Sequence, residues 1–331
     1  MVLAMNCNII FSPTKLHSES YFLRKITSVH IEKSWKRLTD IAEITLPRKA
    51  IGVRNEKGRF FNFYSAHQFI KVGDPVIIEL GYNGHYNVEF TGYITQFIEG
   101  IPLKMKFEDE MYKLKQLPVN ISLQKTTLKK LLKKIVPGYE IDVLEIELGA
   151  LRFAKTTVAK VLEYLKDEYS LYSYMKNKKL VCGKVYADDS EQKTANLHLE
   201  KNVVNSDLNY KNKEDVFIRI NAVSTLFNGN KIEVTVGDEN GEERQLTYYG
   251  IELKAELEKI AKEDLKKYKV DGFTGYVKCF GIPKIEHGQK VNLKSVLYPK
   301  RNGIYYVEST VVDFNATPEF RRKVQLGEKV V

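Results

Sequence analysis

The side chains that could carry chemistry do not form a catalytic or metal-binding pattern. Acidic clusters stand at Glu108-Asp109-Glu110 and Asp188-Asp189. Hydrolysis would need two carboxylates facing each other across a cleft, each in a different environment. Adjacent acids on an alternating strand or in a polar linker are more simply solvated groups. The six histidines never stand at metal-ligand spacing; they are His17, His30, His67, His85, His198 and His287.

The motifs that hold nucleotides or activate nucleophiles are also missing. The chain has no P-loop, nucleophile elbow, H-E-x-x-H pair or dinucleotide fingerprint. The acidic run 238–243 lacks the spacing of a calcium loop and contains the turn pair Asn240-Gly241. We therefore predict that the protein is not an enzyme, with no catalytic, cofactor-binding or metal-binding residues and no cofactor.

Composition favours a folded protein made in a reducing compartment. The 331 residues carry 43% hydrophobic and 28% charged side chains, enough for two or three domains. Three cysteines lie far apart and form no CxxC pair. The chain shows no signal peptide and no run long enough to span a bilayer. We expect cytoplasmic synthesis and no membrane insertion by the chain itself.

The net charge of +10 raises the question of nucleic-acid binding. The lysines are spread over predicted helices beside acidic neighbours, and aromatic residues are not interleaved with them as in a stacking platform. We expect solvated surfaces and no specific nucleic acid.

The chain is organised around a β pattern that occurs twice. The first copy, 71–78, begins Lys71-Val72-Gly73-Asp74 and reads as a tight turn entering a buried strand. The second copy, 286–293, begins Glu286-His287-Gly288-Gln289. Each is followed by a polar loop and a longer strand ending in an aromatic residue, at 88–97 and 304–314. We predict that 71–98 and 286–314 share one topology.

Other segments complete a mainly β architecture with α+β parts. Residues 1–115 predict a first small β-barrel that ends in an alternating strand over 104–114, with irregular chain over 48–70. Residues 116–205 predict a small α/β module and a polar linker. The module has helices starting near Thr126-Thr127 and Thr156-Thr157 and a hairpin over 171–186, and the linker covers 188–210. Residues 206–331 predict a second related barrel with a strand at 216–224. Its insertion at about 229–270 combines a hairpin around Asn240-Gly241 with a helix over 251–268.

This order of parts resembles the baseplate hub proteins of contractile phage tails, the late-control hub family. It is also similar to the hub half of type VI secretion spike proteins. The resemblance is carried by the segments 39–47, 72–76, 90–94, 280–283 and 305–308. It implies a homotrimer in which two related tube-type barrels per chain form a six-unit ring that adapts a six-fold tail tube to a three-fold spike.

The resemblance also implies which partners the protein has. About 15 residues follow the second barrel and no β-helix repeat is present, so the spike would be a separate protein. The partners would be that spike, the tail tube and other baseplate proteins. The protein would assemble in the bacterial cytoplasm and end in the virion tail baseplate or a phage-like injection particle. The alternatives are a nucleic-acid-binding small-barrel protein and a carbohydrate-active module.

Overall fold

The computed structural model describes residues 3–47, 52–62, 70–184, 194–226, 228, 230–299 and 302–330. The chain is mainly β, with 52% strand and 14% helix, as the sequence predicted. Its three cysteines are free and buried. Within these ranges no helix is both long and apolar enough to cross a membrane.

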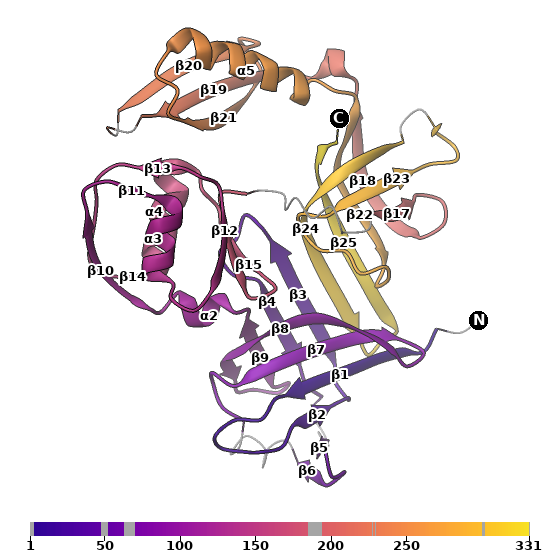
Figure 1. The fold of residues 1–331 in the computed structure, drawn as a ribbon. Coiled ribbons are helices and arrows are strands. Elements are labelled where there is room, and N and C mark those ends of the chain that lie inside the picture. The colour runs from indigo at the N-terminus through magenta and orange to yellow at the C-terminus, as the bar shows by residue number, and fades with distance from the viewer. Residues whose placement is uncertain are drawn as a thin grey trace.

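The N-terminal half of the β structure, here called the first half, covers residues up to 108 (Figure 1). Two short strands, β5 and β6, lie in the stretch that we predicted to be irregular. The predicted alternating strand over 104–114 is shorter than expected, because β9 ends at Glu108 and a helical turn follows. The strands are β1 (Met5–Phe11), β2 (Tyr21–Leu23), β3 (Ser28–Ser34), β4 (Ile41–Thr45), β5 (Gly52–Asn55), β6 (Phe60–Asn62), β7 (Pro75–Tyr82), β8 (His85–Ile98) and β9 (Lys104–Glu108).

The C-terminal half of the β structure, the second half, begins earlier than predicted. Its first two strands lie in 195–211, within the segment we had interpreted as a linker, and the proposed boundary at 205/206 falls inside β18. The polar composition misled because β18 is an edge strand held by backbone pairing with β22. The strands are β17 (Ala195–His198), β18 (Val203–Lys211), β22 (Gly272–Phe280), β23 (Lys290–Lys294), β24 (Gly303–Asn315) and β25 (Glu319–Lys329).

The two halves are joined in one continuous sheet. In the described ranges a 15-stranded sheet runs in the order β18-β22-β25-β24-β3-β4-β9-β8-β7-β1-β2-β5-β6, with β17 attached through β23 to β24. This strand path does not return on itself, so no closed barrel is present there. The halves join where β3 pairs antiparallel with β24, because both edge strands thereby satisfy their backbone groups.

The two halves repeat one strand order. The first half contains β3-β4-β9-β8-β7-β1 and the second half contains β18-β22-β25-β24-β23-β17. The pairing irregularity between Ile94 and Gln96 in β8 has its counterpart between Val307 and Ser309 in β24. The last strands differ, since β1 is antiparallel to β7 whereas β17 is parallel to β23.

The predicted turns are confirmed in both copies. Gly73 and Gly288 have φ of +92° and +78°, which glycine adopts without strain. The Gly73 amide donates to the Ile94 carbonyl at 2.7 Å, and the Gly288 amide donates to the Val307 carbonyl at 2.8 Å. Ile94 therefore corresponds to Val307, and the two longer strands that we predicted to match, β8 and β24, are counterparts.

The α/β module packs around its own apolar cluster beside the first half. The Thr127 side chain caps α3 by accepting a hydrogen bond from the Lys130 amide at 3.3 Å, which confirms the predicted helix start. The elements are α2 (Met111–Leu114), β10 (Pro118–Leu123), β11 (Thr126–Thr127), α3 (Leu128–Ile135), β12 (Glu140–Val143), β13 (Glu147–Leu148), β14 (Leu151–Thr157), α4 (Val158–Tyr169), β15 (Ser173–Lys176) and β16 (Lys179–Cys182).

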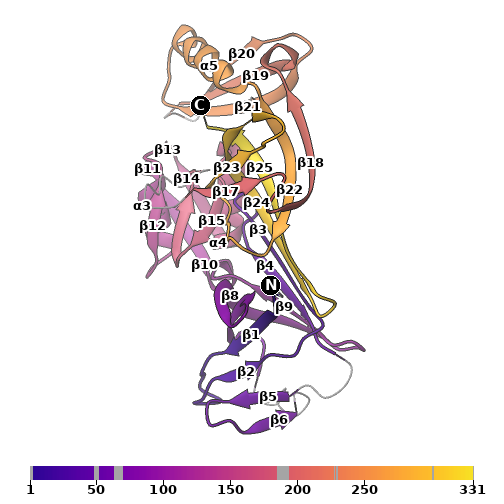
Figure 2. The same ribbon diagram turned by 90° about the vertical axis from the view of Figure 1, so that its right-hand side faces the viewer.

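A second small unit, the insertion, sits at one end of the second half (Figure 2). Its strands and helix are β19 (Ile218–Thr225), β20 (Lys231–Gly237), β21 (Glu242–Tyr249) and α5 (Lys254–Tyr268), preceded by a short 3-10 turn, η1 (Lys213–Asp215). The predicted hairpin between β20 and β21 is wrong. These strands lie on opposite sides of β19, in the order β20-β19-β21, because β19 supplies the fully buried Ile220 and Ala222 to the small core.

Candidate functional site

The seam between β3 and β24 is the feature that makes one body of the two halves. Its register runs from Ser34 opposite Ser309 to Ser28 opposite Asn315. His30 lies between two carboxylates, with Nδ1 2.7 Å from Asp313 Oδ1 and Nε2 3.0 Å from Glu32 Oε1. The hydrogen bond to Asp313 raises the pKa of His30 to about 9, so the ring is charged at neutral pH.

The halves also share a hydrophobic core. The first-half cluster around Ile9, Ile31 and Phe90 includes Phe314 and Phe320 from the second half. The Tyr82 hydroxyl donates to the Phe320 carbonyl at 3.0 Å. The core of the first half is therefore completed by residues near the C-terminus.

A buried ion pair fastens β8 to β25 across this junction. Glu89 Oε1 accepts from Arg322 Nη2 at 2.7 Å, and each side chain is 1% exposed. The same guanidinium donates to the carbonyls of Gly281 at 2.9 Å and Ile285 at 3.2 Å. A buried charge needs such partners because water is excluded from it.

A polar cluster lies where both halves meet the α/β module. Asp40, Asp109 and His287 line a cavity of about 280 Å³ together with Glu89. His287 Nε2 is 3.8 Å from Asp40 Oδ2. Burial, then the nearby Asp40 carboxylate, raises the pKa of Asp109 well above its usual range. Sequence reasoning placed Asp109 among solvated acids, and that interpretation is wrong because β9 ends just before it and α2 turns it inward.

The neighbouring acids in that sequence cluster have structural partners. Glu108 pairs with Lys115. Glu110 accepts hydrogen bonds from the hydroxyls of Tyr93 at 2.7 Å and Tyr139 at 2.8 Å. His67 and Asp188-Asp189 lie outside the described residues. In the described ranges no group of three histidine, cysteine or acidic side chains could hold a metal ion.

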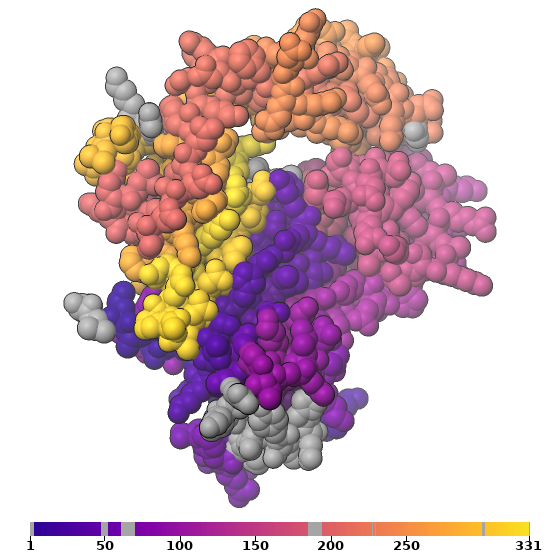
Figure 3. All heavy atoms as spheres, turned by 180° about the vertical axis from the view of Figure 1, so that it is seen from behind, coloured from indigo at the N-terminus to yellow at the C-terminus, as the bar shows by residue number. Residues whose placement is uncertain are grey.

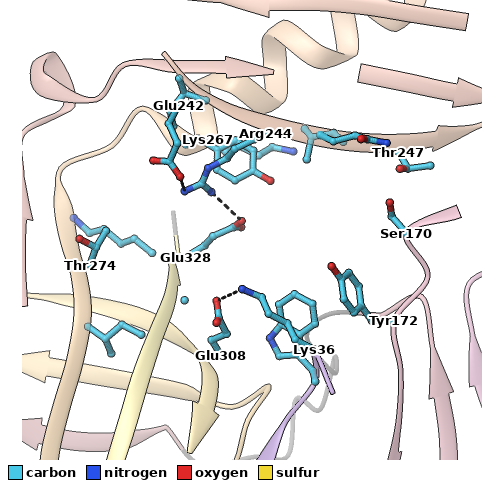
Figure 4. A pocket seen from close by; sticks show the side chains of 18 of the residues that line it. Lys36, Ser170, Tyr172, Glu242, Arg244, Thr247, Lys267, Thr274, Glu308 and Glu328 are labelled. Carbon is cyan, nitrogen blue, oxygen red and sulfur yellow. Dashed lines mark ion pairs between the residues drawn. The ribbon is translucent and has the colours of Figure 1, made fainter. Parts of the chain in front are cut away.

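A cavity of about 830 Å³ opens between the insertion, the α/β module and the second half. Figure 3 shows the opening from behind, below the insertion. Lys36 pairs with Glu308 at 2.7 Å, and Arg244 lies 4.0 Å from Glu328 and 3.8 Å from Glu242 (Figure 4). Each of these side chains has a counter-charge, and the ion pairs do not form a nucleophile–base arrangement.

One small contact joins the insertion to the α/β module across this cavity. The Tyr249 hydroxyl donates to the Tyr169 carbonyl, and the two rings stack with centroids 6.5 Å apart. Lys231 lies 3.5 Å from Glu168 on the same side. These contacts hold the insertion against the α/β module beside the cavity.

Comparison with known proteins identifies the fold through structure and not through sequence. No protein-family model and no curated protein matches this chain. The fold is similar to that of the tail protein from Neisseria meningitidis, with a TM-score of 0.63 and 14% identity over 99% of this chain and 97% of that one. A 43 kDa tail protein of prophage MuSo2 from Shewanella oneidensis gives 0.62 and 13%, covering 98% of each chain.

A third similar structure comes from a secretion system. The E. coli c3393 protein, a component of the type VI secretion system, gives a TM-score of 0.52 and 9% identity over 92% of this chain and 73% of that one. The chain therefore has the fold of phage tail proteins and of type VI secretion components.

Proposed function

We propose that this chain is the structural baseplate hub of a phage tail or a phage-tail-like injection machine. It would act as a homotrimer that adapts the six-fold tail tube to a three-fold spike. The observation that carries the proposal is the repeated strand order of the two halves, including the matched turns at Gly73 and Gly288. Two equivalent units per chain give six units from three chains.

The finer features of the assembly belong to the same proposal. Each half would complete a tube-type barrel in the assembled ring, flanking the α/β module. We keep the division into three parts as a proposal, with the second boundary moved in front of β17, since β17 and β18 pair with strands of the second half. The partners would be a separate spike protein, the tail tube and other baseplate proteins, with assembly in the bacterial cytoplasm before incorporation into the particle.

We also propose that the chain is not an enzyme. The similar structures are tail and secretion-system components, and the buried acids described above have structural partners. Assays for peptidoglycan and nucleotide hydrolysis should give no turnover. Activity abolished by Asp109→Asn in a folded variant would contradict this part of the proposal.

Native mass spectrometry of the chain, alone and co-expressed with its trimeric spike, tests the hub role. We expect a species of about 115 kDa, three times the 38.2 kDa of one chain. Electron microscopy should show a ring with six similar lobes. A complex with the spike that contains one or two chains per spike trimer would overturn the proposal.

A further inference from the structure

The chain passes from the sheet into the α/β module at one buried acidic residue. β9 ends at Glu108, Asp109 follows, and α2 begins at Met111. The Asp109 amide donates to the Asp40 carbonyl at 3.1 Å, and Asp109 Oδ1 accepts from the Met111 amide at 3.1 Å. Figure 1 shows α2 where the module adjoins β4 and β9. Asp109 is therefore a hinge residue that is bonded on one side to the β3–β4 connection and on the other side to the module.

Three buried side chains from distant parts of the sequence meet at this hinge. Asp40, Asp109 and His287 are 9%, 8% and 8% exposed. His287 Nε2 lies 3.8 Å from Asp40 Oδ2, and its Nδ1 is buried without a hydrogen bond among the described residues. The His287 ring stands edge-on to Tyr174 of β15, with the ring centroids 5.0 Å apart. The cluster thus touches both halves and the module.

The charges that face the cluster from the two halves are paired with one another. Lys33 of β3 pairs with Glu286 at 3.2 Å, and Lys284 pairs with the same carboxylate at 2.9 Å. Glu89 of β8 accepts from Arg322 of β25 at 2.7 Å. These groups therefore balance each other around the cavity of about 280 Å³ that the cluster lines.

The charges beside the hinge and on the module also have other surroundings. Glu108 pairs with a lysine, and Glu110 accepts hydrogen bonds from two tyrosine hydroxyls. Lys176 and Lys178 of the β15–β16 hairpin line the cavity, and Lys178 is exposed to water. The two aspartates of the cluster differ from these groups in both burial and pairing.

The arrangement favours a neutral carboxyl at the hinge. Among the described residues Asp109 forms no ion pair, and the cationic partner of Asp40 is His287 at 3.8 Å. Burial, then the neighbouring Asp40 carboxylate, raises the pKa of Asp109 well above its usual range. Docking of the module is therefore strongest below about pH 3.9, the value for a free aspartate, and weakens as pH rises through the raised pKa.

We propose that Asp40, Asp109 and His287 form a proton-controlled latch that sets how firmly the α/β module docks on the two halves. With a proton on Asp109 Oδ2, the hinge carries one carboxylate and stays closed. When that proton passes to solvent, two buried carboxylates repel each other at the hinge and the module loosens. The latch goes beyond the hub role and does not depend on how many chains assemble.

The single tryptophan of the chain reports on this junction. Trp35 follows β3, is 7% exposed and packs in a small buried cluster with Tyr174 and Val181 of the module. Its ring stands edge-on to Tyr172, with centroids 5.1 Å apart. The indole Nε1 is buried, so its hydrogen can exchange with solvent only when the module moves away. Exchange of this one indole N–H therefore measures opening of the latch.

Indole hydrogen exchange of the full chain, followed by NMR from about pH 4.5 to about pH 8.5 and corrected for the intrinsic rate at each pH, tests the latch. Each unit by which docking raises the pKa weakens docking about tenfold once Asp109 is ionised, so protection in the wild type should fall at least about tenfold with rising pH. Asp109→Asn, whose amide resembles the protonated carboxyl, should keep high protection at every pH. Asp40→Asn should reduce the fall, because it removes the repulsion but not the burial of Asp109.

Two further variants identify the titrating group. Asp167→Asn removes an exposed carboxylate from α4 of the same module and should follow the wild type. His287→Gln should keep the dependence on pH, since the proton that matters is on Asp109. Thermal melting of each variant verifies that it folds.

The latch is overturned if protection in the wild type does not change with pH, or if folded Asp109→Asn keeps the wild-type fall. A fall that is lost in His287→Gln but kept in Asp109→Asn would assign the response to the histidine and also overturn it. If Asp109→Asn does not fold, Asp40→Asn decides the matter, because an undiminished fall in that variant contradicts repulsion between the two carboxylates. The number of chains in the assembly, measured separately, bears on the hub role and leaves these outcomes unchanged.

Discussion

Replacing Glu89 by glutamine should test whether the buried ion pair holds the two halves together. Glu89 and Arg322 are each 1% exposed, so the substitution leaves a buried guanidinium without a counter-charge. Loss of one partner of a buried pair typically costs about 3–5 kcal/mol. Arg322 keeps its hydrogen bonds to two backbone carbonyls, which places the expected cost near the lower end, about 3 kcal/mol.

The double variant Glu89→Met/Arg322→Met separates charge from hydrogen bonding. It removes both charges but leaves the carbonyls of Gly281 and Ile285 without their donor, at about 1–3 kcal/mol for each group. We therefore expect the double variant to lose less stability than the sum of the losses in the single variants Glu89→Met and Arg322→Met. A result additive within about 0.5 kcal/mol would mean that the two side chains do not interact.

Native-state hydrogen exchange of the β25 amides is the suitable assay, because it reports the free energy of opening at this junction rather than of the whole chain. Glu163→Gln is the matched control. The side chains of Glu163 and Lys160 are 50% and 70% exposed, so water screens their ion pair and its loss should leave β25 exchange unchanged. If β25 in Glu89→Gln opens within about 1 kcal/mol of wild type, the pair does not fasten the halves.

Three further changes address single contacts. Because the pKa of His30 is raised, the charged ring stabilises the folded protein fully below about pH 6.5, the unfolded value, and this stabilisation is lost as pH rises through about 9. His30→Gln should therefore flatten the fall in melting temperature between these pH values. An unchanged dependence of melting temperature on pH would refute this. The carboxylate of Glu200 accepts a hydrogen bond from the Ser295 hydroxyl at 2.6 Å, and this bond together with two amide donors lowers the pKa of Glu200 to about 2. The stabilisation is present above about pH 4.3, the unfolded value, and is lost as pH falls towards 2. Glu200→Gln should therefore speed amide exchange in 295–298 at pH 7, and unchanged exchange would argue against it. Tyr249→Phe removes the hydroxyl that donates to the Tyr169 carbonyl and should weaken docking of the insertion on the α/β module by about 1 kcal/mol. We expect faster proteolysis around 249–254 and unchanged amide exchange in α5. Faster exchange in α5 as well would mean that the insertion itself unfolds.

Local features of the fold could be predicted from the sequence. The start of α3 follows from Thr127 and the apolar spacing after it, and both glycine turns follow from four-residue patterns. These features depend on interactions a few residues apart, which a single sequence displays directly. The contacts of the 108–110 acids were not predicted: Glu108 pairs with Lys115, and Glu110 accepts a hydrogen bond from the Tyr93 hydroxyl.

Pairing between distant strands could not be predicted. The Asn240-Gly241 pair correctly predicted a turn, but the strands on either side of it do not pair with each other and flank β19 instead. Which strand becomes the central one depends on all three segments together. The polar β18 looked like a linker because an edge strand needs little apolar content. The pairing of β3 with β24 was not predicted, because nothing near His30 in the sequence indicates a partner 283 residues away.

The seam has a consequence for how the chain reaches its native state during synthesis. β3 leaves the ribosome early, yet β24 and the core residue Phe320 follow about 280 residues later. At roughly 5–20 residues per second this delay is on the order of 15–60 s. During that time the first half has an incomplete core and an unpaired edge strand. The first half therefore cannot finish folding before the second half has been synthesised. We expect nascent chains that lack the last 30 residues to bind holdase chaperones, because the core of the first half closes only when the final hairpin emerges.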